Sequence, residues 1–179
     1  MAPHTSPRHG SATVSLVLGG ARSGKSRYAQ ARIEALPGKL AFIATAEAGD
    51  PEMIERIARH QADRGPRWTA CEAAIDLPAA IRRAQGDADA ILVDCMTLWL
   101  SNLMHAERDI DAATSELETA IRDSRVPLGL VSNEVGGGIV PANPLARRFR
   151  DHAGRLNQRL AAIAEEAVLV TAGLPLRLK

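Results

Sequence analysis

The chain alternates short apolar runs with longer segments in which apolar residues recur every three or four positions. Apolar runs of this length are typical of buried strands, and the longer periodicity predicts amphipathic helices. Strands are predicted at residues 14–18, 40–44, 90–93, 128–131 and 168–170. Helices are predicted at residues 25–36, 51–64, 77–84, 98–105, 110–122 and 145–166. This order favours an α/β fold in which a mainly parallel sheet is flanked by helices.

The two ends of the chain differ from this pattern. Residues 174–178 contain Pro175 and follow Gly173, which predicts a short antiparallel edge strand that returns through a tight turn. Residues 1–13 are rich in Pro, Ser and His, and we expect a flexible N-terminal extension there. No repeat or linker divides the remainder, so residues 14–179 are predicted to form a single domain.

Composition narrows the class of protein. Apolar residues make up 46% of the chain, and 22 Lys and Arg against 21 Asp and Glu leave a net charge of +1. This balance argues against a general affinity for nucleic acid or an anionic membrane. No segment approaches the ~20 apolar residues of a membrane span. Cys71 and Cys95 lack the spacing of a metal or redox pair, so we expect free thiols in a cytoplasmic protein.

A phosphate-binding motif follows the first predicted strand directly. The eight residues are Gly19, Gly20, Ala21, Arg22, Ser23, Gly24, Lys25 and Ser26, and they fit the P-loop pattern G-x-x-x-x-G-K-[ST]. Glycines allow backbone N–H groups to turn inward around a polyphosphate, and a helix N-terminus favours negative charge. Lys25 is predicted to reach the outer phosphates and Ser26 to offer its hydroxyl to Mg²⁺. The alternative, an empty Gly-rich turn, leaves these two residues unexplained.

A candidate partner for the metal ends another strand. The run 90–93 is followed by Asp94, as in the strand that carries the Mg²⁺-binding acid of P-loop enzymes. Taken alone, Asp94 is equally well placed to cap the next helix. Because no Asn-Lys-x-Asp motif is present, the sequence does not indicate a guanine preference.

His60 lies beside the apolar stripe of the predicted helix 51–64. A lone histidine at such a position is usually structural. A neutral imidazole is also a nucleophile that can attack phosphorus, and Arg64, one turn further on, could neutralise a phosphate beside it.

Beyond these motifs, the chain from about Ser15 to Lys179 resembles the bifunctional adenosylcobinamide kinase / adenosylcobinamide-phosphate guanylyltransferases of cobalamin biosynthesis. The resemblance is carried by ordered matches along the whole chain. They are the P-loop 19–26, Ile-Ala-Thr-Ala at 43–46, Arg56-Ile57 with His60, Arg67-Trp68 with Glu72, Asn102-Leu103, Asn133-Glu134-Val135-Gly136 with 138–141, 143–151 and 154–158.

The resemblance implies a P-loop fold of RecA-like type and two activities. The first is phosphorylation of adenosylcobinamide by ATP or GTP. The second is transfer of GMP from GTP to adenosylcobinamide phosphate, which gives adenosylcobinamide-GDP and pyrophosphate. In such enzymes a guanylylated histidine is the intermediate, and His60 stands at that motif position. The resemblance also implies that Mg²⁺ is the cofactor and that the protein is a homotrimer.

Further nucleotide-site residues follow by the same resemblance. They are Ala44, Thr45, Ala46, Gln61, Ala62, Asp63, Arg64, Glu72 and Asp94, with Ser26 and Asp94 at the metal. Some of these have simpler readings, since Thr45 can merely end a strand and Glu72 can be a solvated acid. The residue after His60 is the uncharged Gln61, a departure from the family pattern that removes one possible cation beside the phosphate.

The loop after the strand 128–131 is predicted to lie where open α/β sheets bind ligands. Its run Gly136-Gly137-Gly138 suits close approach of a corrinoid or of a neighbouring subunit, and the sequence does not choose between them. The arginines from Arg147 to Arg159 are interpreted mainly as a solvated helix face. Two rival functions remain at this level: a small-molecule kinase with an inert His60, and a nucleotide-dependent switch.

Overall fold

The computed structural model describes residues 12–46 and 65–179. Within these ranges the strands form one seven-stranded sheet in the order β3-β2-β4-β5-β1-β6-β7. The strands are β1 (Val14–Gly19), β2 (Leu40–Ala44), β3 (Trp68–Glu72), β4 (Ala90–Asp94), β5 (Leu128–Asn133), β6 (Glu166–Thr171) and β7 (Leu174–Arg177). All neighbouring pairs are parallel except β6 and β7, which are antiparallel. The predicted parallel sheet and antiparallel C-terminal strand are therefore confirmed.

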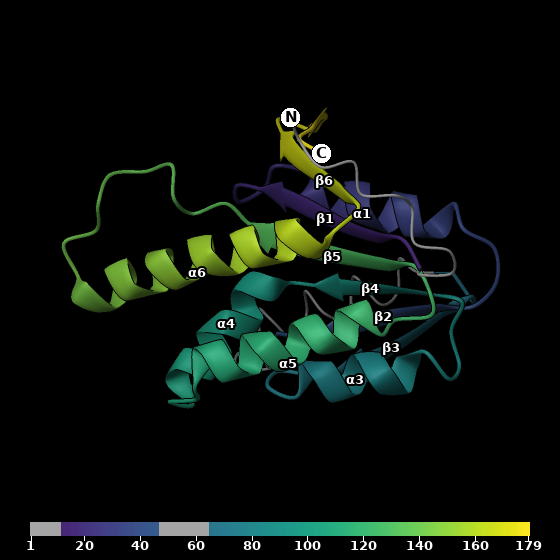
Figure 1. Cartoon of the computed structure of the whole chain (residues 1–179). Coiled ribbons are helices and arrows are strands. Elements are labelled where there is room, and N and C mark those ends of the chain that lie inside the picture. The colour runs from purple at the N-terminus through teal and green to yellow at the C-terminus, as the bar shows by residue number, and fades with distance from the viewer. Residues whose placement is uncertain (1–11, 47–64) are drawn as a thin grey trace, which may run out of the picture.

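The helices described are α1 (Lys25–Glu34), α3 (Leu77–Ala84), α4 (Met96–His105), α5 (Ile110–Arg122) and α6 (Pro144–Ile163). They cover the sheet unequally. Helix α1 packs on one face, against β1, β4, β5 and β6, and α3, α5 and α6 lie side by side along the other face (Figure 1). Helix α4 lies on that second face against α6 and β5.

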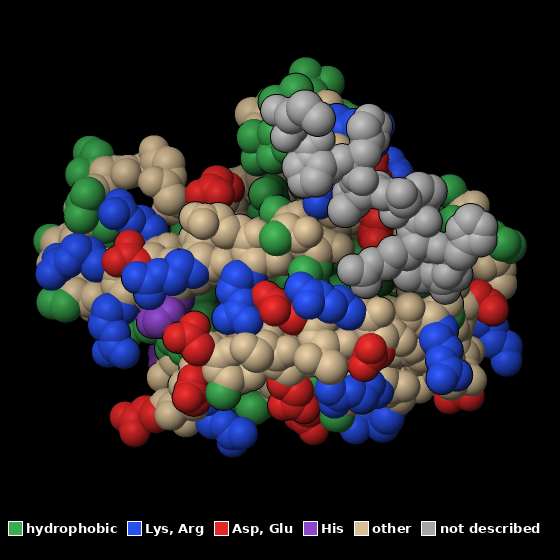
Figure 2. Space-filling view, viewed as in Figure 1, with side chains coloured by type: hydrophobic (Ala, Val, Ile, Leu, Met, Phe, Trp, Pro, Cys, Tyr) green, Lys and Arg blue, Asp and Glu red, His purple; other side chains and the backbone are tan. Residues whose placement is uncertain are grey.

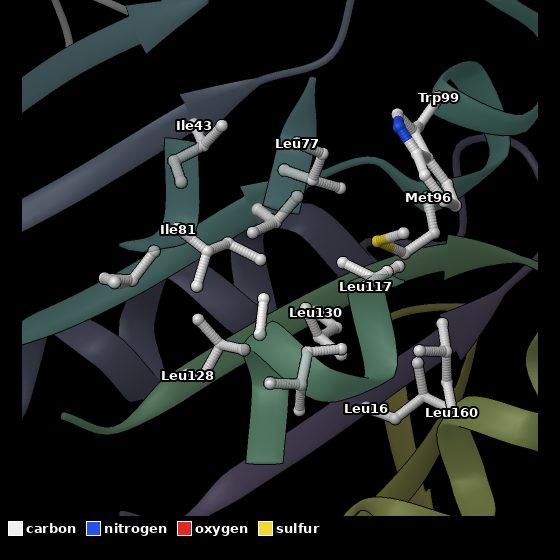
Figure 3. Close-up of a cluster of buried hydrophobic side chains, with 14 of the residues drawn as sticks. Leu16, Ile43, Leu77, Ile81, Met96, Trp99, Leu117, Leu128, Leu130 and Leu160 are labelled. Carbon is white, nitrogen blue, oxygen red and sulfur yellow. The ribbon is translucent and has the colours of Figure 1, made fainter. Parts of the chain in front are cut away.

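Alternating side chains of the strands separate the core into two parts. Leu16, Ile43, Leu128 and Leu130 are buried with the leucines and the tryptophan of α3 to α6, as Figure 3 shows. Residues of opposite parity, such as Val17 and Val131, pack against α1. The central strands β1, β2, β4 and β5 are thus apolar on both faces, which is the reason that their sequences read as unbroken apolar runs.

Local signals explain where several helices begin. The side chain of Asp109 accepts a hydrogen bond from the N–H of Ala112 at the start of α5. Asn143 caps α6 by accepting from the N–H groups of Leu145 and Ala146, and Pro144 occupies the first helical turn.

The predicted boundaries are wrong at several places. Helix α6 ends at Ile163 rather than at residue 166, because Glu166 pairs with Ser15 and begins β6. Helix α4 begins at Met96, two residues before its prediction, and α1 ends at Glu34 rather than at residue 36.

Strand β3 was not predicted. Four of its five residues are exposed, so it shows no apolar run, and it exists through its pairing with β2 at the sheet edge. The predicted helix 51–64 and most of the expected N-terminal extension lie outside the described residues. Within the described residues, no helix is long and apolar enough to cross a membrane.

Candidate nucleotide-binding site

The segment Gly19 to Ser26 joins β1 to α1 and has the backbone shape of a phosphate cradle. Gly24, which stands before the first helical residue Lys25, has φ 94°, and Arg22 has φ 55°. Positive φ values turn successive N–H groups toward one side of the loop, as an anion-binding nest requires. A Cβ at Gly19 would lie 2.5 Å from Ser23 Oγ and 2.6 Å from the Val170 carbonyl oxygen. Glycine is therefore required where the strand turns into the loop.

The C-terminal hairpin supports this cradle. The turn between β6 and β7 contains Ala172 and Gly173, both at positive φ, and the Gly173 N–H donates to the Ser23 carbonyl oxygen at 2.8 Å. A Cβ at Gly24 would lie 3.3 Å from the Gly173 Cα. The backbone of the hairpin and that of the cradle are thus in direct contact, so the antiparallel end of the sheet helps to hold the loop open.

Polar groups in the cradle are only partly satisfied by the protein. Lys25 is 9% exposed, and its Nζ donates to the Gly20 carbonyl oxygen at 3.2 Å, a long bond. The Ser23 Oγ is buried and has no hydrogen-bond partner among the described residues. Buried cations and hydroxyls without good partners are costly, so the loop is built to receive an anion.

Two acidic side chains lie at the carboxyl edge of the sheet, on the two strands that flank β2. Strand register places Ala44 level with Glu72 on one side and with Asp94 on the other. Asp94 has the same strand parity as Leu92, which packs on the α1 side, so its carboxylate is on the face from which the cradle departs. Glu72 is exposed at the outer edge.

The alternative in which Asp94 caps the next helix is wrong. Cys95, and not Asp94, is the N-cap residue of α4. Neither the Asp94 carboxylate nor the Ser26 hydroxyl makes a hydrogen bond within the described parts of the chain. Burial raises the pKa of the Cys95 thiol, and the charge of Asp94 adds to that rise.

Thr45 is fully buried and its hydroxyl is occupied. The hydroxyl donates to the Cys95 carbonyl oxygen at 2.6 Å and accepts from the Cys95 N–H at 2.8 Å. The Asn102 side-chain amide donates to the carbonyl oxygens of Thr45 at 2.7 Å and Ala74 at 3.1 Å. These bonds tie the ends of β2 and β4 to α4, so the Thr45 side chain holds the sheet edge together. Ala46, next to it, is half-buried.

Several predicted site residues fall outside the described part of the structure. They are His60, Gln61, Ala62, Asp63 and Arg64. The described residues of the predicted site are Gly19 to Ser26, Ala44 to Ala46, Glu72 and Asp94. They belong to the ends of β1, β2, β3 and β4, the turns that follow β1 and β2, and the start of α1, at the same edge of the sheet.

A polar cluster that sequence reasoning missed lies beside the cradle. Ser132 Oγ donates to Asn157 Oδ1 at 2.7 Å and lies 3.4 Å from Thr97 Oγ1, all three side chains being buried. Thr97 accepts from the Asn133 N–H at 2.7 Å, and Asn157 Nδ2 donates to the Asn133 carbonyl oxygen at 3.1 Å. Asn133 and Asn157 both belong to the matched motifs. A motif does not reveal hydrogen-bond partners, and those of the Asn133 backbone come from Thr97 of α4 and Asn157 of α6.

The segment between β5 and α6 extends away from the sheet (Figure 1). Its Ile139 is 97% exposed and Val140 is 60% exposed, and hydrophobic side chains are visible on this loop in Figure 2. Gly136, at its start, lines a shallow hollow of about 330 Å³ with Arg150, Asp151, Gly154, Arg155 and Gln158 of α6.

The arginines of α6 have different partners. Arg147 donates to the carbonyl oxygens of Pro141 and Ala142, and Arg159 pairs with Glu118 at 2.7 Å. On the face shown in Figure 2, acidic and basic side chains are interspersed over α5 and α6. The prediction of a mainly solvated helix face agrees with these contacts.

Comparison with known proteins identifies the family. A family model described as cobinamide kinase / cobinamide phosphate guanyltransferase matches residues 15–178. The chain belongs to this cobinamide kinase / guanyltransferase family. The family model thus spans the cradle, the Asp94 strand and the segment that contains His60.

Curated relatives and one solved structure agree with the assignment. The bifunctional adenosylcobalamin biosynthesis protein CobP of Pseudomonas aeruginosa is 43% identical over 167 residues, covering 92% of this chain and 96% of the relative. CobU of Salmonella typhimurium, with the same descriptive name, is 43% identical over 179 residues, covering 92% and 98%. A KaiC-like protein of Pyrococcus horikoshii aligns with TM-score 0.56 at 13% identity, over 88% of this chain and 71% of that one. This last likeness shows the fold alone, and it agrees with the predicted α/β fold with a mainly parallel sheet.

Proposed function

We propose that the chain phosphorylates adenosylcobinamide with ATP or GTP and then transfers GMP from GTP to adenosylcobinamide phosphate, which gives adenosylcobinamide-GDP and pyrophosphate. The observation that carries the proposal is the preformed cradle from Gly19 to Ser26 in a chain that matches the family along nearly its whole length. The names of the relatives, bifunctional proteins of adenosylcobalamin biosynthesis, support it.

Both reactions use the same binding contacts to the triphosphate. Backbone N–H groups of the cradle and the ammonium of Lys25 hold the outer phosphates and stabilise negative charge on the leaving oxygens. The long bond from Lys25 to the Gly20 carbonyl oxygen is weak enough to be exchanged for a phosphate contact. Electrostatic stabilisation of this kind, in a site already shaped for it, supplies much of the rate in phosphoryl transfer.

We propose His60 as the nucleophile of the nucleotidyl transfer. A ring nitrogen attacks the α-phosphorus of GTP, an N–P bond forms, and the bond from that phosphorus to the α–β bridging oxygen breaks as pyrophosphate leaves. A phosphate oxygen of adenosylcobinamide phosphate then attacks the same phosphorus and frees the imidazole. Gln61, Ala62, Asp63 and Arg64 belong to this proposal as nucleotide contacts, as do Ala44, Thr45, Ala46 and Glu72.

Mg²⁺ fits the residues present. Ser26 and Asp94 offer a hydroxyl and a carboxylate oxygen, which are ligands of the kind that Mg²⁺ prefers. Both groups are free of hydrogen bonds within the described residues. When bound, the ion neutralises charge on the phosphates. Ser26 would hold it directly and Asp94 directly or through water.

Labelled GTP tests the function. The protein is incubated with α-labelled GTP and Mg²⁺, denatured, and examined for label that is acid-labile and alkali-stable. Label is expected on the parent protein and is expected to be absent from His60→Ala, and adenosylcobinamide phosphate is expected to discharge it into a corrinoid product. A pure kinase or a nucleotide-dependent switch would retain none. A switch would also release nucleoside diphosphate and inorganic phosphate without pyrophosphate.

Three further properties belong to the same proposal. Residues 14–179 act as one catalytic domain, the protein is cytoplasmic, and it assembles as a homotrimer. Light scattering of the purified protein measures the assembly directly, and a monomer at micromolar concentration would overturn that part.

A further inference from the structure

Asn133 is the last residue of β5, the strand that separates the cradle strand β1 from the Asp94 strand β4. Register pairs Asn133 with Gly19, and the N–H of Glu134 donates to the Gly19 carbonyl oxygen at 3.1 Å. On the other side, Asp94 is level with Val131, so Asn133 lies two residues further along its strand. Asn133 therefore stands between the start of the phosphate loop and the proposed metal ligand.

Strand parity decides which way the Asn133 side chain extends. Ser132 bonds to Thr97 and Asn157, on the face covered by α4 and α6. Val131 packs on the opposite face, in the cluster that contains Ala29 and Ile33 of α1. Successive side chains alternate, so Asn133 shares the face of Val131. That is the face on which α1 begins and the cradle opens.

The backbone of Asn133 is fixed, while its side-chain amide is not. Its N–H and carbonyl oxygen are bonded to Thr97 and Asn157. Its Oδ1 is buried and has no hydrogen-bond partner within residues 12–46 and 65–179. Burial of an unpaired amide oxygen costs stability, so an Oδ1 of this kind at the end of a strand calls for a partner that the described residues do not supply.

We propose that Asn133 contacts the substrates of the kinase step, with its side-chain amide directed at the terminal phosphoryl group of the triphosphate and at the alcohol that attacks it. This inference rests on the proposed function. Lys25 and Asp94 are proposed to act at the outer end of the polyphosphate, and Asn133 lies on the strand beside Asp94, two residues further along and on the same face. The amide is therefore near the γ-phosphorus and further from the α-phosphorus, where His60 acts.

The chemistry suits an amide and not a base. Oδ1 accepts the hydrogen bond of the alcohol O–H and so orients its oxygen toward the γ-phosphorus, while Nδ2 donates to a γ-phosphoryl oxygen. The alcohol oxygen forms a bond to that phosphorus, the bond to the β–γ bridging oxygen breaks, and nucleoside diphosphate leaves with the electron pair. The alcohol proton passes to solvent. Orientation of two reactants in this way is a large contribution to such reactions.

Asn133→Ala tests the inference, with both half-reactions measured on the same preparation. The kcat for phosphorylation of adenosylcobinamide is expected to fall about 10²-fold, as on removal of one preorganised transition-state contact. The KM for the triphosphate and the rate of His60 guanylylation by GTP are expected to stay within about threefold, since the γ-phosphoryl group leaves intact with pyrophosphate. Because the lost oxygen is unpaired, the melting temperature is expected to be unchanged or higher.

Ser132→Ala is the matched control. It changes the neighbouring residue of the same strand and is expected to lower the melting temperature while leaving the ratio of the two rates unchanged. Equal loss of both rates in Asn133→Ala, or no loss of the kinase rate in a folded protein, would overturn the inference. Should Asn133→Ala fold poorly, the ratio of the kinase rate to the guanylylation rate is measured in Asn133→Ser, which keeps a smaller polar side chain. Failure of the parent protein to catalyse either reaction would instead overturn the proposed function.

Discussion

At the carboxyl edge of the sheet, the two faces differ in how far their buried polar groups are hydrogen-bonded. On the face covered by α4 and α6, Ser132, Thr97 and Asn157 are buried and bonded to one another or to the backbone. Toward the cradle, Lys25 makes one long bond, and the buried oxygens of Ser23 and Asn133 make none within the described residues. Satisfied polar groups stabilise a fold, whereas unsatisfied ones cost stability and are retained where a ligand completes them.

Lys25→Ala tests the polar groups on the cradle side most directly, and it is expected to have the largest effect on the two rates. Both kcat/KM values are expected to fall about 10³-fold, or about 4 kcal/mol, because the ammonium stabilises charge on the leaving phosphates. The free energy of unfolding is expected to change little, since the Lys25 side chain makes a single, long hydrogen bond within the described residues. Lys39→Ala, at an exposed lysine, is the control for general loss of positive charge. A large loss of stability with normal rates would contradict the division between the faces.

Asp94→Asn extends the comparison to the proposed metal ligand. The substitution preserves shape and removes the charge, so the Mg²⁺ concentration for half-maximal rate is expected to rise about 10–100-fold. Saturating Mg²⁺ should restore much of the rate, and unfolding measurements should match those of the parent. Titration of both half-reactions with MgCl₂ provides the measurement. An unchanged Mg²⁺ requirement would exclude Asp94 as a metal ligand.

Thr45→Val tests a satisfied group at the same edge. The change keeps the side-chain shape but leaves the Cys95 N–H and carbonyl oxygen without their partner. Denaturant unfolding is expected to show a loss of about 2 kcal/mol, the combined cost of the lost bonds and an orphaned buried donor. Thr45→Ser, which retains the hydroxyl, is expected to recover most of it. Equal stability of the Val variant and the parent would mean that these bonds contribute little.

Ser132→Ala is expected to have the smallest effect. It contrasts most sharply with Asn133→Ala, because it is expected to lower stability and to leave the ratio of the two rates unchanged. Loss of its bond to Asn157 is expected to cost about 1 kcal/mol of unfolding free energy, because one neutral hydrogen bond disappears. Thermal unfolding and the two rates are measured together. Selective loss of one rate in this variant would show that the network on the α4 and α6 face also serves chemistry, and the proposed division would fail.

Much of the fold was predictable because its signals are local. Apolar runs over 14–18, 40–44, 90–93, 128–131 and 168–170 correspond to five strands of the sheet, and the turn at Gly173 correctly predicted the antiparallel β7. Strand β3 could not be found in this way, since its exposed residues carry no periodic apolar signal. The end of α6 was missed for a similar reason. Glu166 continues a helical pattern but is taken into the sheet by pairing with Ser15.

The amino-acid sequence alone determined the phosphate cradle and the family, because a P-loop is one contiguous segment whose glycines, lysine and serine act through their own backbone and side chains. It also marked Asp94, Asn102, Asn133 and Asn157 as members of matched motifs. Only the tertiary structure decided what they do. Asn102 ties the ends of β2 and β3, and Asn157 holds β5. The side-chain oxygen of Asn133, beside the cradle, has no hydrogen-bond partner among the described residues. The physical reason is that a hydrogen bond is satisfied or not by groups that the fold brings together from distant parts of the chain, and such partners leave no trace in local sequence.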